Sequence, residues 1–403
     1  MSIYKAQTCL LCSPPAILRP SALSLSLISI LMEETSKLQL PETFLSFLEA
    51  NGIDPSIYTH GDSIPRYVRL KPGFEYLSQE IESEISCKLE KVKWLPGFYS
   101  IPPDVHIARS KAYQQGKMYG IDAASGAAVS ALGISPGDHV LDLCAAPGAK
   151  LCMMLDLLGE MGTATGVDVA RHRLAACRTM LQKYGLGGSF GDDHEDTFKQ
   201  WTSRRPYKER KQEAKTMNKF VLPQNGQPEI IFYGHSSGVV GLKKKELYRS
   251  LDQKDYAYCG YDKVLVDAEC THDGSIKHIQ KFEQWGWNTL ERRVLDAERT
   301  DRNLTALQLN LLRNGFRLLK QGGTLVYSTC SLTLAQNEDV VDHFLAESSS
   351  AELQEIETAK DWPCRSGRTP KTVRFEPSTS ATSGLFVAKI RKLPNKEAEK
   401  NVL

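Results

Sequence analysis

One stretch of the chain, residues 137–170, limits the possible folds more than any other. It contains a short apolar run (140–143), a turn of small residues (144–149), a helical pattern and a second apolar run (163–167) that ends at Asp168. Short apolar runs are typical of buried parallel strands. A turn between strand and helix presents backbone N–H groups to a ligand, and an acid at the second strand's tip can bind both ribose hydroxyls. The stretch therefore predicts a nucleoside-binding βαβ unit, although other βαβ crossovers share this outline.

Composition predicts an ordinary globular protein. A chain of 403 residues has room for one large domain and a smaller one, and 41% hydrophobic and 24% charged residues are common values. The net charge of +2 means that any nucleic-acid site must be a local patch. The ten cysteines are scattered, and the C-x-x-C pair of Cys9 and Cys12 has no second pair, so we expect free thiols and no metal site. No apolar run reaches the roughly 18 residues of a membrane span, so we expect no membrane contact.

Residues 1–31 form a leader with two alternative explanations. They lack Asp and Glu, are rich in Ser and Leu, and carry Lys5 and Arg19, which is typical of an organellar transit segment. Met32 begins an ordinary-looking start, so the leader is equally well explained as untranslated or removed. The expected location accordingly stays open between nucleus or cytoplasm and a mitochondrion or chloroplast.

Residues 41–125 predict a small N-terminal α/β appendage. Its expected strand, within 64–73, carries Arg66, Arg69 and Lys71. Two interpretations carry equal weight: the cations are solvated charges of a lid, or they contact RNA.

Residues 126–395 predict the larger domain. Apolar runs at 261–267, 324–331 and 384–391 alternate with helical patterns, which indicates an α/β fold with a doubly wound sheet. A third strand is expected soon after Gly185, but the residues there are polar and glycine-rich. Residues 199–258 are basic and loop-like, so we interpret them as an insertion, either a surface loop or a contact for a nucleic-acid backbone.

Two of the predicted strands end in a cysteine. Cys270 follows Asp-Ala-Glu, and Cys330 follows Ser-Thr. Ligands of such sheets bind outside the carboxyl ends of the strands, so both thiols should face the same crevice as the turn at Gly148. A buried cysteine is normally a small hydrophobic residue. Two of them at strand tips, beside Asp267, indicate chemistry instead.

The motifs resemble those of the Sun/Fmu family of RNA cytosine-5 methyltransferases, which use S-adenosylmethionine. The resemblance implies a Rossmann-like class I methyltransferase fold, and it departs from the family pattern at Ala149, where a second glycine is usual, and at Glu269, where proline is usual. The matching segments are 65–69, 142–150, 166–168 with Arg171 and Arg173, 267–270, 322–331 with Asn337 and Glu338, and 384–389.

The resemblance implies a covalent mechanism. Carbon 5 of cytosine is a weak nucleophile until a thiolate adds to carbon 6. By resemblance, Cys330 is the attacking thiolate and Cys270 releases the product, while Asp267 bonds the ring nitrogen of the base. The target cytosine must be unpaired or flipped into the pocket.

The resemblance also implies the cofactor site. Asp168 should bind the ribose, and Asp196 should bind the adenine amino group, with Asp192 and Asp193 as rivals. The residues expected to bind the cofactor are Cys144, Ala145, Ala146, Pro147, Gly148, Ala149, Lys150, Asp168, Arg173, Asp196 and Asp267. The implied partner is tRNA or rRNA, and we expect a monomer.

Two other functions remain open at this point. The departures at Glu269 and in 199–258 raise the alternative of a catalytically weak or inactive relative that binds RNA or a protein partner. A methyltransferase acting on protein or on a small molecule is the other alternative, and the paired cysteines argue against it.

Overall fold

The computed structural model describes residues 40–58, 64–159, 162–168, 171–185, 229–234, 260–291, 295 and 304–394. Contacts divide the chain into residues 1–39 and 40–403, and every described residue belongs to the second unit. The predicted leader therefore lies outside the described residues, as do Asp192, Asp193 and Asp196. No helix in the described part of the chain is long and apolar enough to cross a membrane.

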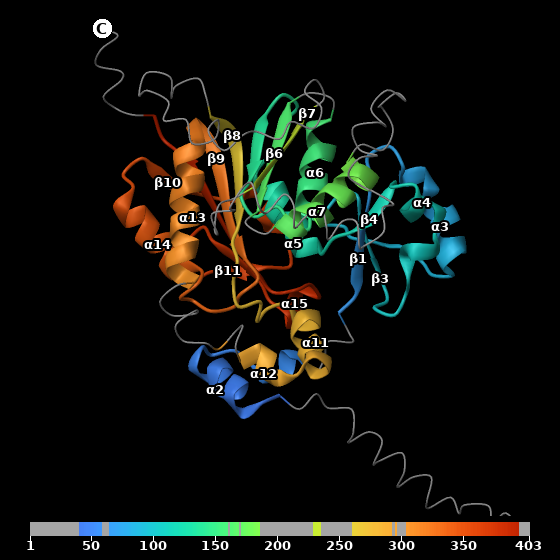
Figure 1. Ribbon diagram of the computed structural model, residues 1–403, viewed down its shortest axis with the longest axis horizontal. Helices are drawn as coiled ribbons and strands as arrows, with labels where there is room; N and C mark the ends of the chain where they lie inside the picture. The colour runs from blue at the N-terminus through green and yellow to red at the C-terminus, as the bar shows by residue number, and fades with distance from the viewer. Residues whose placement is uncertain are drawn as a thin grey trace, which may run out of the picture. The chain divides into compact units, whose positions relative to one another are not determined.

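A mixed sheet forms the centre of the molecule (Figure 1). Its strand order is β11-β12-β13-β9-β8-β5-β6-β7, and β10 pairs with β13. β5 pairs in parallel with β6 and β8, and β8 pairs in parallel with β9, whereas β13 runs antiparallel to β9. The strands are β5 (His139–Asp142), β6 (Thr163–Asp168), β7 (Glu229–Gly234), β8 (Tyr261–Asp267), β9 (Leu319–Thr329), β10 (Ala351–Gln354), β11 (Arg365–Ser366), β12 (Val373–Phe375) and β13 (Leu385–Lys392).

Helices cover both faces of this sheet (Figure 1), which confirms the predicted doubly wound α/β fold. Because side chains alternate along a strand, Leu265 and Val326 pack with α5, α6 and α7, whereas Val266 and Tyr327 pack with α13 and α14. The helices are α5 (Ala123–Ala131), α6 (Ala149–Leu158), α7 (Arg171–Met180), α13 (Thr305–Leu318), α14 (Glu338–Glu347) and the short α15 (Pro377–Ser380).

The strand next to β6 differs from the prediction. It is β7, which runs antiparallel to β6 and comes from residues 229–234, not from the residues after Gly185. The interpretation of 199–258 as a surface loop is therefore wrong for these six residues. The physical reason is composition: Glu-Ile-Ile-Phe-Tyr-Gly is apolar and β-branched or aromatic, while 186–198 is polar and rich in glycine.

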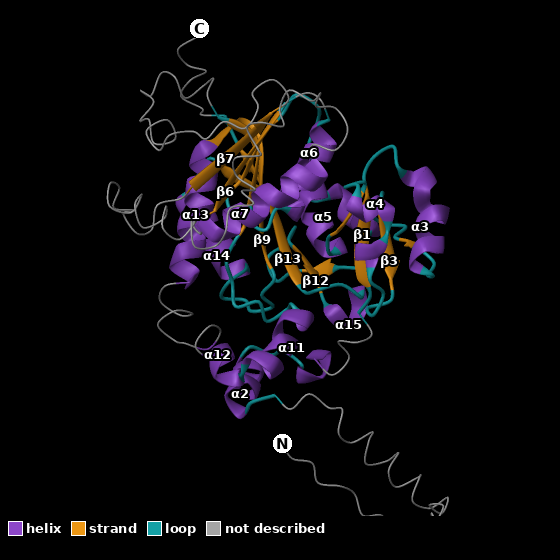
Figure 2. Cartoon of the chain, turned by 45° about the vertical axis from the view of Figure 1, so that its right-hand side comes forward, coloured by secondary structure: helices purple, strands orange, loops and turns teal. Residues whose placement is uncertain are grey.

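The N-terminal segment occupies two places. An antiparallel sheet of order β2-β3-β1-β4 carries α3 and α4 and stands beside the main sheet (Figure 2). In contrast, α2 lies with α11 and α12 in both views, and the hydroxyl of Tyr58 donates to the carbonyl of Asp273 at 2.7 Å. The elements are α2 (Glu42–Ala50), β1 (Arg66–Leu70), α3 (Ser78–Ile85), β2 (Glu90–Lys91), β3 (Phe98–Ile101), α4 (Lys111–Gln114), β4 (Met118–Gly120), α11 (Ile276–Trp285) and α12 (Trp287–Leu290). Short single turns of helix lie at Pro55–Tyr58, Glu75–Leu77, Ile107–Arg109, Leu181–Gly185 and Glu357–Asp361.

The predicted basic strand β1 does not present its charges as expected. Arg69 and Lys71 are buried, and each lies 3.4 Å from a carboxylate oxygen of Asp156 on α6. Arg66 donates to the carbonyl of Val105 at 3.0 Å. Neither interpretation, solvated charges or RNA contact, holds for Arg69 and Lys71. A buried carboxylate needs an opposite charge, so these two cations join the small sheet to the large domain.

Candidate active site

The predicted cofactor turn follows β5 and leads into α6. The peptide bond between Ala146 and Pro147 is cis, and Gly148 has a φ of 114° just before the helix begins at Ala149. A Cβ atom at Gly148 would lie 2.9 Å from the sulfur of Cys177. A side chain there would be strained and would also collide with α7, so the small residue is a packing requirement.

Asp168, the last residue of β6, is tied to this turn. The backbone N–H of Ala146 donates to the Asp168 carboxylate at 3.4 Å. Arg173 donates to the carbonyl of Ala146 at 2.9 Å, and another of its nitrogens lies 3.7 Å from Asp168. The carboxylate is thus held at the strand tip, beside the N-terminus of α6. This arrangement fits a nucleoside whose ribose bonds the acid.

One cleft of about 1120 Å³ joins the turn to the two cysteines. Its lining includes nine residues of the predicted site: Cys144, Ala146, Pro147, Lys150, Asp168, Arg173, Asp267, Cys270 and Cys330. Three further residues of the turn do not line the cleft: Ala145, Gly148 and Ala149. They contribute to the path of the backbone in the turn. Asp196 lies outside the described residues, and its role stays a prediction.

Cys270 and Cys330 meet at the carboxyl ends of β8 and β9. Their sulfur atoms are 3.2 Å apart. The Nδ1 atom of His272 lies 3.0 Å from the Cys330 sulfur and 3.6 Å from the Cys270 sulfur. The sequence pattern predicted that both thiols face one crevice, and the structure brings them into contact.

The two thiols ionise as a pair. Burial alone would raise the pKa of Cys270, but the hydrogen bond with Cys330 and the charge of His272 hold that pKa well below its usual value. The pKa of Cys330 is raised well above its usual value, first by the hydrogen bond to Cys270 and then by burial. The negative charge of Cys270 raises the pKa of His272 to about 9. The two sulfurs therefore titrate as a unit, and transfer of a proton across the 3.2 Å contact exchanges thiol and thiolate.

Asp267 connects the cysteines to the cofactor turn. One of its oxygens accepts from the Lys150 ammonium at 2.7 Å, and the other accepts from the Ser328 hydroxyl at 2.7 Å. Lys150 comes from the first turn of α6, and Ser328 precedes Cys330 by two residues. The carboxylate remains about a quarter exposed, so it is reachable from the cleft.

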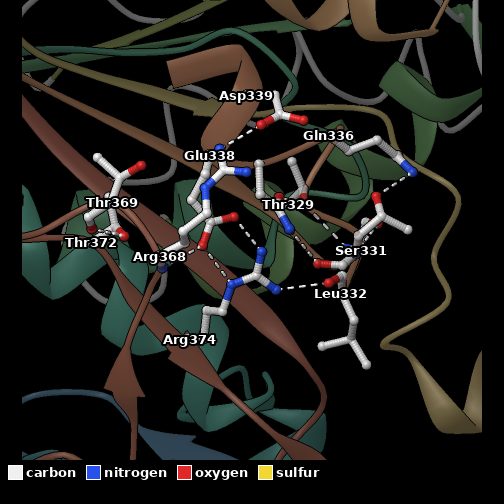
Figure 3. A network of polar contacts seen from close by, with 12 residues as sticks. Thr329, Ser331, Leu332, Gln336, Glu338, Asp339, Arg368, Thr369, Thr372 and Arg374 are labelled. Atoms are coloured by element: carbon white, nitrogen blue, oxygen red, sulfur yellow. Dashed lines mark hydrogen bonds and ion pairs between the residues drawn. The ribbon is translucent and has the colours of Figure 1, made fainter. Parts of the chain in front are cut away.

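A buried polar network holds the loop that follows Cys330. Asn337 donates to the carbonyl of Ser331 at 2.8 Å and accepts from the hydroxyl of Thr329 at 2.6 Å. Gln336 donates to the hydroxyl of Thr271 at 2.9 Å, which joins the two cysteine loops. Figure 3 shows Arg374 next to this loop: it donates to the carbonyl of Leu332 at 2.7 Å and pairs with Glu338. Such a network fixes the positions of both thiols.

The two cysteine loops also approach one another closely at Gly274. Its N–H donates to the carbonyl of Cys330 at 2.9 Å, and its own carbonyl accepts from Gly384 at 2.8 Å. A Cβ atom at Gly274 would lie 2.6 Å from the Cys330 carbonyl oxygen. Glycine is therefore needed here for close backbone contact.

No sequence motif singled out His272. It lies two residues after Cys270, in a segment that pattern alone would call a loop, and its approach to Cys330 depends on contacts across 58 residues of chain. Gln336 was missed for the same reason. The one available signal was the position of His272 beside a strand-ending cysteine.

Comparison with known proteins identifies the family of this chain. The sequence model of the 16S rRNA methyltransferase RsmB/F family matches residues 129–204 and 240–391. The chain belongs to the RsmB/F family. The membership confirms the predicted resemblance and places the protein among S-adenosylmethionine-dependent RNA cytosine-5 methyltransferases. The small-residue turn and the buried acid at the end of β6 fit that cofactor.

Relatives of the RsmB/F protein differ in how much of their length the chain matches. It is 26% identical to the tRNA (cytosine(49)-C(5))-methyltransferase of Pyrococcus abyssi over 90% of this chain and 95% of the relative. It is 30% identical to the 5-cytosine rRNA methyltransferase NSUN4 of Bos taurus over 55% of this chain and 43% of the relative. The chain thus spans less than half of the NSUN4 relative.

Solved structures support the fold. The structure of NSun6 from Pyrococcus horikoshii has a TM-score of 0.58 at 17% identity, and the match covers 88% of this chain and 99% of that one. A methyltransferase homolog protein from the same organism has a TM-score of 0.55 at 22% identity, over 88% and 100% of the two chains. The predicted class I methyltransferase fold of this RsmB/F protein is confirmed.

Proposed function

We propose that this protein methylates carbon 5 of a cytosine in RNA through a covalent bond between Cys330 and carbon 6 of the base. The observation that carries the proposal is the contact of two thiols, 3.2 Å apart, in the cleft that also holds the Asp168 turn. S-adenosylmethionine, when bound, supplies an electrophilic methyl group. The residues that would hold it are the turn at 144–150, Asp168 and Arg173.

Cys330 makes the acceptor reactive. As the thiolate adds to carbon 6, the electron pair of the C5–C6 double bond becomes available at carbon 5. The proton that Cys330 gives up passes to Cys270, which is its hydrogen-bond partner. Asp267 is fixed by Lys150 and Ser328 at the end of β8. Its carboxylate is placed to accept a hydrogen bond from the ring nitrogen once that nitrogen takes up a proton from solvent, which offsets the negative charge that thiolate addition brings to the base.

Cys270 then acts in release. Once carbon 5 carries the methyl group, its proton passes to solvent, the electron pair of that C–H bond restores the C5–C6 double bond, and the C–S bond breaks to leave Cys330 as a thiolate that takes back the proton held by Cys270. Cys270 touches Cys330 and lines the cleft, so it is placed to take part in this elimination. The two thiols have different tasks because only one of them can bond carbon 6 at a time.

The RNA is tRNA or rRNA, and the target cytosine is unpaired or flipped. The relatives support both classes, since the first is named a tRNA enzyme and the second an rRNA enzyme. Cys270 is buried and lines the cleft together with Cys330, and enzymes that act on a base must take it out of the stack to bring it into such a pocket. We further propose that the protein acts as a monomer. We also propose that residues 1–31, where they are translated, direct the protein to an organelle. A fusion of these residues to a fluorescent protein tests the targeting.

The test is adduct formation with RNA that contains 5-fluorocytosine. Fluorine at carbon 5 cannot leave as a proton does, so a covalent protein–RNA complex should accumulate when S-adenosylmethionine is present. The complex should vanish in Cys330→Ala and in protein without the cofactor. No adduct with the wild-type protein, on RNA that it methylates when unmodified, would overturn the role of Cys330.

A further inference from the structure

His272 lies against both active-site sulfurs, and neither the family resemblance nor the comparisons assign it a role. Its Nδ1 atom is 3.0 Å from the Cys330 sulfur and 3.6 Å from the Cys270 sulfur. These distances are within hydrogen-bonding range for sulfur. The imidazole is therefore able to exchange a proton with the cysteine pair directly.

The backbone at His272 shows that this placement is enforced. Its φ is 59°, in the left-handed region that residues other than glycine rarely adopt. The buried side chain of Asp273 holds the segment, because it accepts from the N–H of Leu332 at 2.6 Å and from the hydroxyl of Thr271. The N–H of Thr271 donates to Gln336 at 3.1 Å. Unfavourable backbone conformations persist where surrounding contacts impose them, often at functional sites.

We propose that His272 is a catalytic residue that ionises the cysteine pair and thereby makes Cys330 nucleophilic. One proton of the cysteine pair binds Nδ1 of His272 and the other resides on Cys270, so the lone pair left on the Cys330 sulfur forms the bond to carbon 6 of cytosine. Nothing is oxidised or reduced in this step. The inference rests on the proposed function, since it names the group that activates the thiol of that reaction.

The charges around His272 favour its protonated form. The end of β8 and the loop after it contribute Asp267, Glu269 and Cys270. Cys330 follows β9 directly, and α11 contributes His278, whose ring centre lies 5.1 Å from that of His272. Asp273 is buried next to it in the chain. The cation Lys150 lines the same cleft, and it pairs with Asp267 at 2.7 Å. The imidazolium is thus balanced by the thiolate that it creates.

The experiment measures thiol ionisation in the free protein, without RNA or cofactor. Wild-type protein and His272→Asn are alkylated with iodoacetamide at pH values from 5 to 10, and mass spectrometry follows Cys270 and Cys330 separately. Asparagine tolerates the left-handed conformation but is not a base. In the wild type one of the two thiols should titrate well below the pKa of an ordinary cysteine. In His272→Asn it should titrate near the ordinary ~8.5, with at least a tenfold slower reaction at pH 7.

Controls make the result specific. His343→Gln, which changes an exposed histidine on α14, should keep the wild-type profile. Binding of S-adenosylhomocysteine by His272→Asn shows that the variant is folded, and His272→Gln serves as a second variant. An unchanged alkylation profile in folded His272→Asn would overturn the proposal. One equivalent of zinc that copurifies with the wild type and is lost in His272→Asn would also overturn it, because the histidine would then act as a metal ligand.

The measurement also separates this inference from the proposed function. If the thiol titration behaves as expected but no 5-fluorocytosine adduct forms, His272 activates the cysteines for another reaction. If the adduct forms and the titration does not depend on His272, the methylation proposal stands and the role of His272 is wrong.

Discussion

The ammonium of Lys150 and the carboxylate of Asp267 lie 2.7 Å apart and join the helix after the cofactor turn to the strand that leads to Cys270. Burial alone would lower the pKa of Lys150, but Asp267 outweighs it and the pKa is raised. Since Asp267 also accepts from Ser328, a single carboxylate fixes the ends of β8 and β9 relative to α6. One ion pair thus connects the helix after the cofactor turn with the strand end beside the two cysteines.

The first prediction concerns that ion pair. Asp267→Asn should lower kcat by about 10²–10³-fold, because an amide holds the protonated ring nitrogen of the base less strongly than a carboxylate does and no longer forms an ion pair with Lys150. Lys150→Met should lower activity as well, since it leaves Asp267 without its cation. Methylation of RNA with radiolabelled S-adenosylmethionine measures both effects.

A matched control lies on the same strand. Lys320 pairs with Asp262 at 2.9 Å near the amino end of β8, with similar exposure of the two side chains. Lys320→Met should therefore retain wild-type kcat. Equal losses in Lys320→Met and Lys150→Met would indicate a general effect on folding and contradict the special role of Lys150.

The second prediction concerns release. Cys270→Ala should still form the bond between Cys330 and ordinary cytosine but should break it slowly, so a covalent protein–RNA complex should persist on denaturing gels without 5-fluorocytosine. The double variant Cys270→Ala/Cys330→Ala should give no such complex. Multiple turnover by Cys270→Ala at the wild-type rate would show that Cys270 has no part in release.

The third prediction concerns the cofactor. Asp168→Asn should raise the Kd for S-adenosylhomocysteine by about 10–100-fold, because hydrogen bonds to a charged group contribute about 1.5–3 kcal/mol. Arg173→Ala should have a smaller effect, since Arg173 contacts Asp168 and the carbonyl of Ala146, and Asp168 keeps its bond from the N–H of Ala146 without these contacts. Isothermal titration calorimetry gives both values, and Lys320→Met again serves as the unaffected variant.

Local patterns predicted the parts of this site that local sequence determines. Small residues at 144–149 predicted the turn because a side chain at Gly148 has no room, and the cysteines that close two apolar runs predicted their meeting because parallel strands end at one edge. The predictions that were wrong concern features that depend on contacts between residues far apart in the sequence. Arg69 resembled a surface cation until Asp156, 87 residues away, was placed beside it, and β7 was missed because its pairing with β6 spans a long segment.

The fourth prediction concerns pH and Asp142. Burial, followed by the charge of Asp267, raises the pKa of this carboxyl to about 7. The folded protein therefore holds a proton that the unfolded chain loses near pH 4, and this part of its stability is lost as the pH rises from about 4 to about 7. Asp142→Asn keeps the acceptor for the N–H of Cys144 and removes the charge. Urea unfolding should show equal stability near pH 4 and an advantage of up to about 4 kcal/mol for Asp142→Asn at pH 8.

Asp262 provides the contrast for this experiment. The N–H of His139 and the ammonium of Lys320 outweigh its partial burial and lower its pKa. Its contribution to stability is therefore present above the unfolded pKa and lost as the pH falls. Asp262→Asn should be destabilised relative to the wild type at pH 8, the opposite of Asp142→Asn. The same sign for both variants would contradict the assigned pKa of Asp142.

The last prediction concerns the ion pair of Arg374 and Glu338, which is buried beside the Cys330 loop (Figure 3). Arg374→Met should lower the free energy of unfolding by about 3–5 kcal/mol, because it leaves the buried carboxylate of Glu338 without its opposite charge. Arg374→Met/Glu338→Gln should recover much of that loss, since the amide still accepts from the N–H of Arg368. Arg313→Met breaks an exposed pair with Glu347 and should leave the urea midpoint unchanged. If the double variant were no more stable than Arg374→Met, the loss of stability would come from the broken hydrogen bond between Arg374 and the carbonyl of Leu332 and not from an unpaired Glu338.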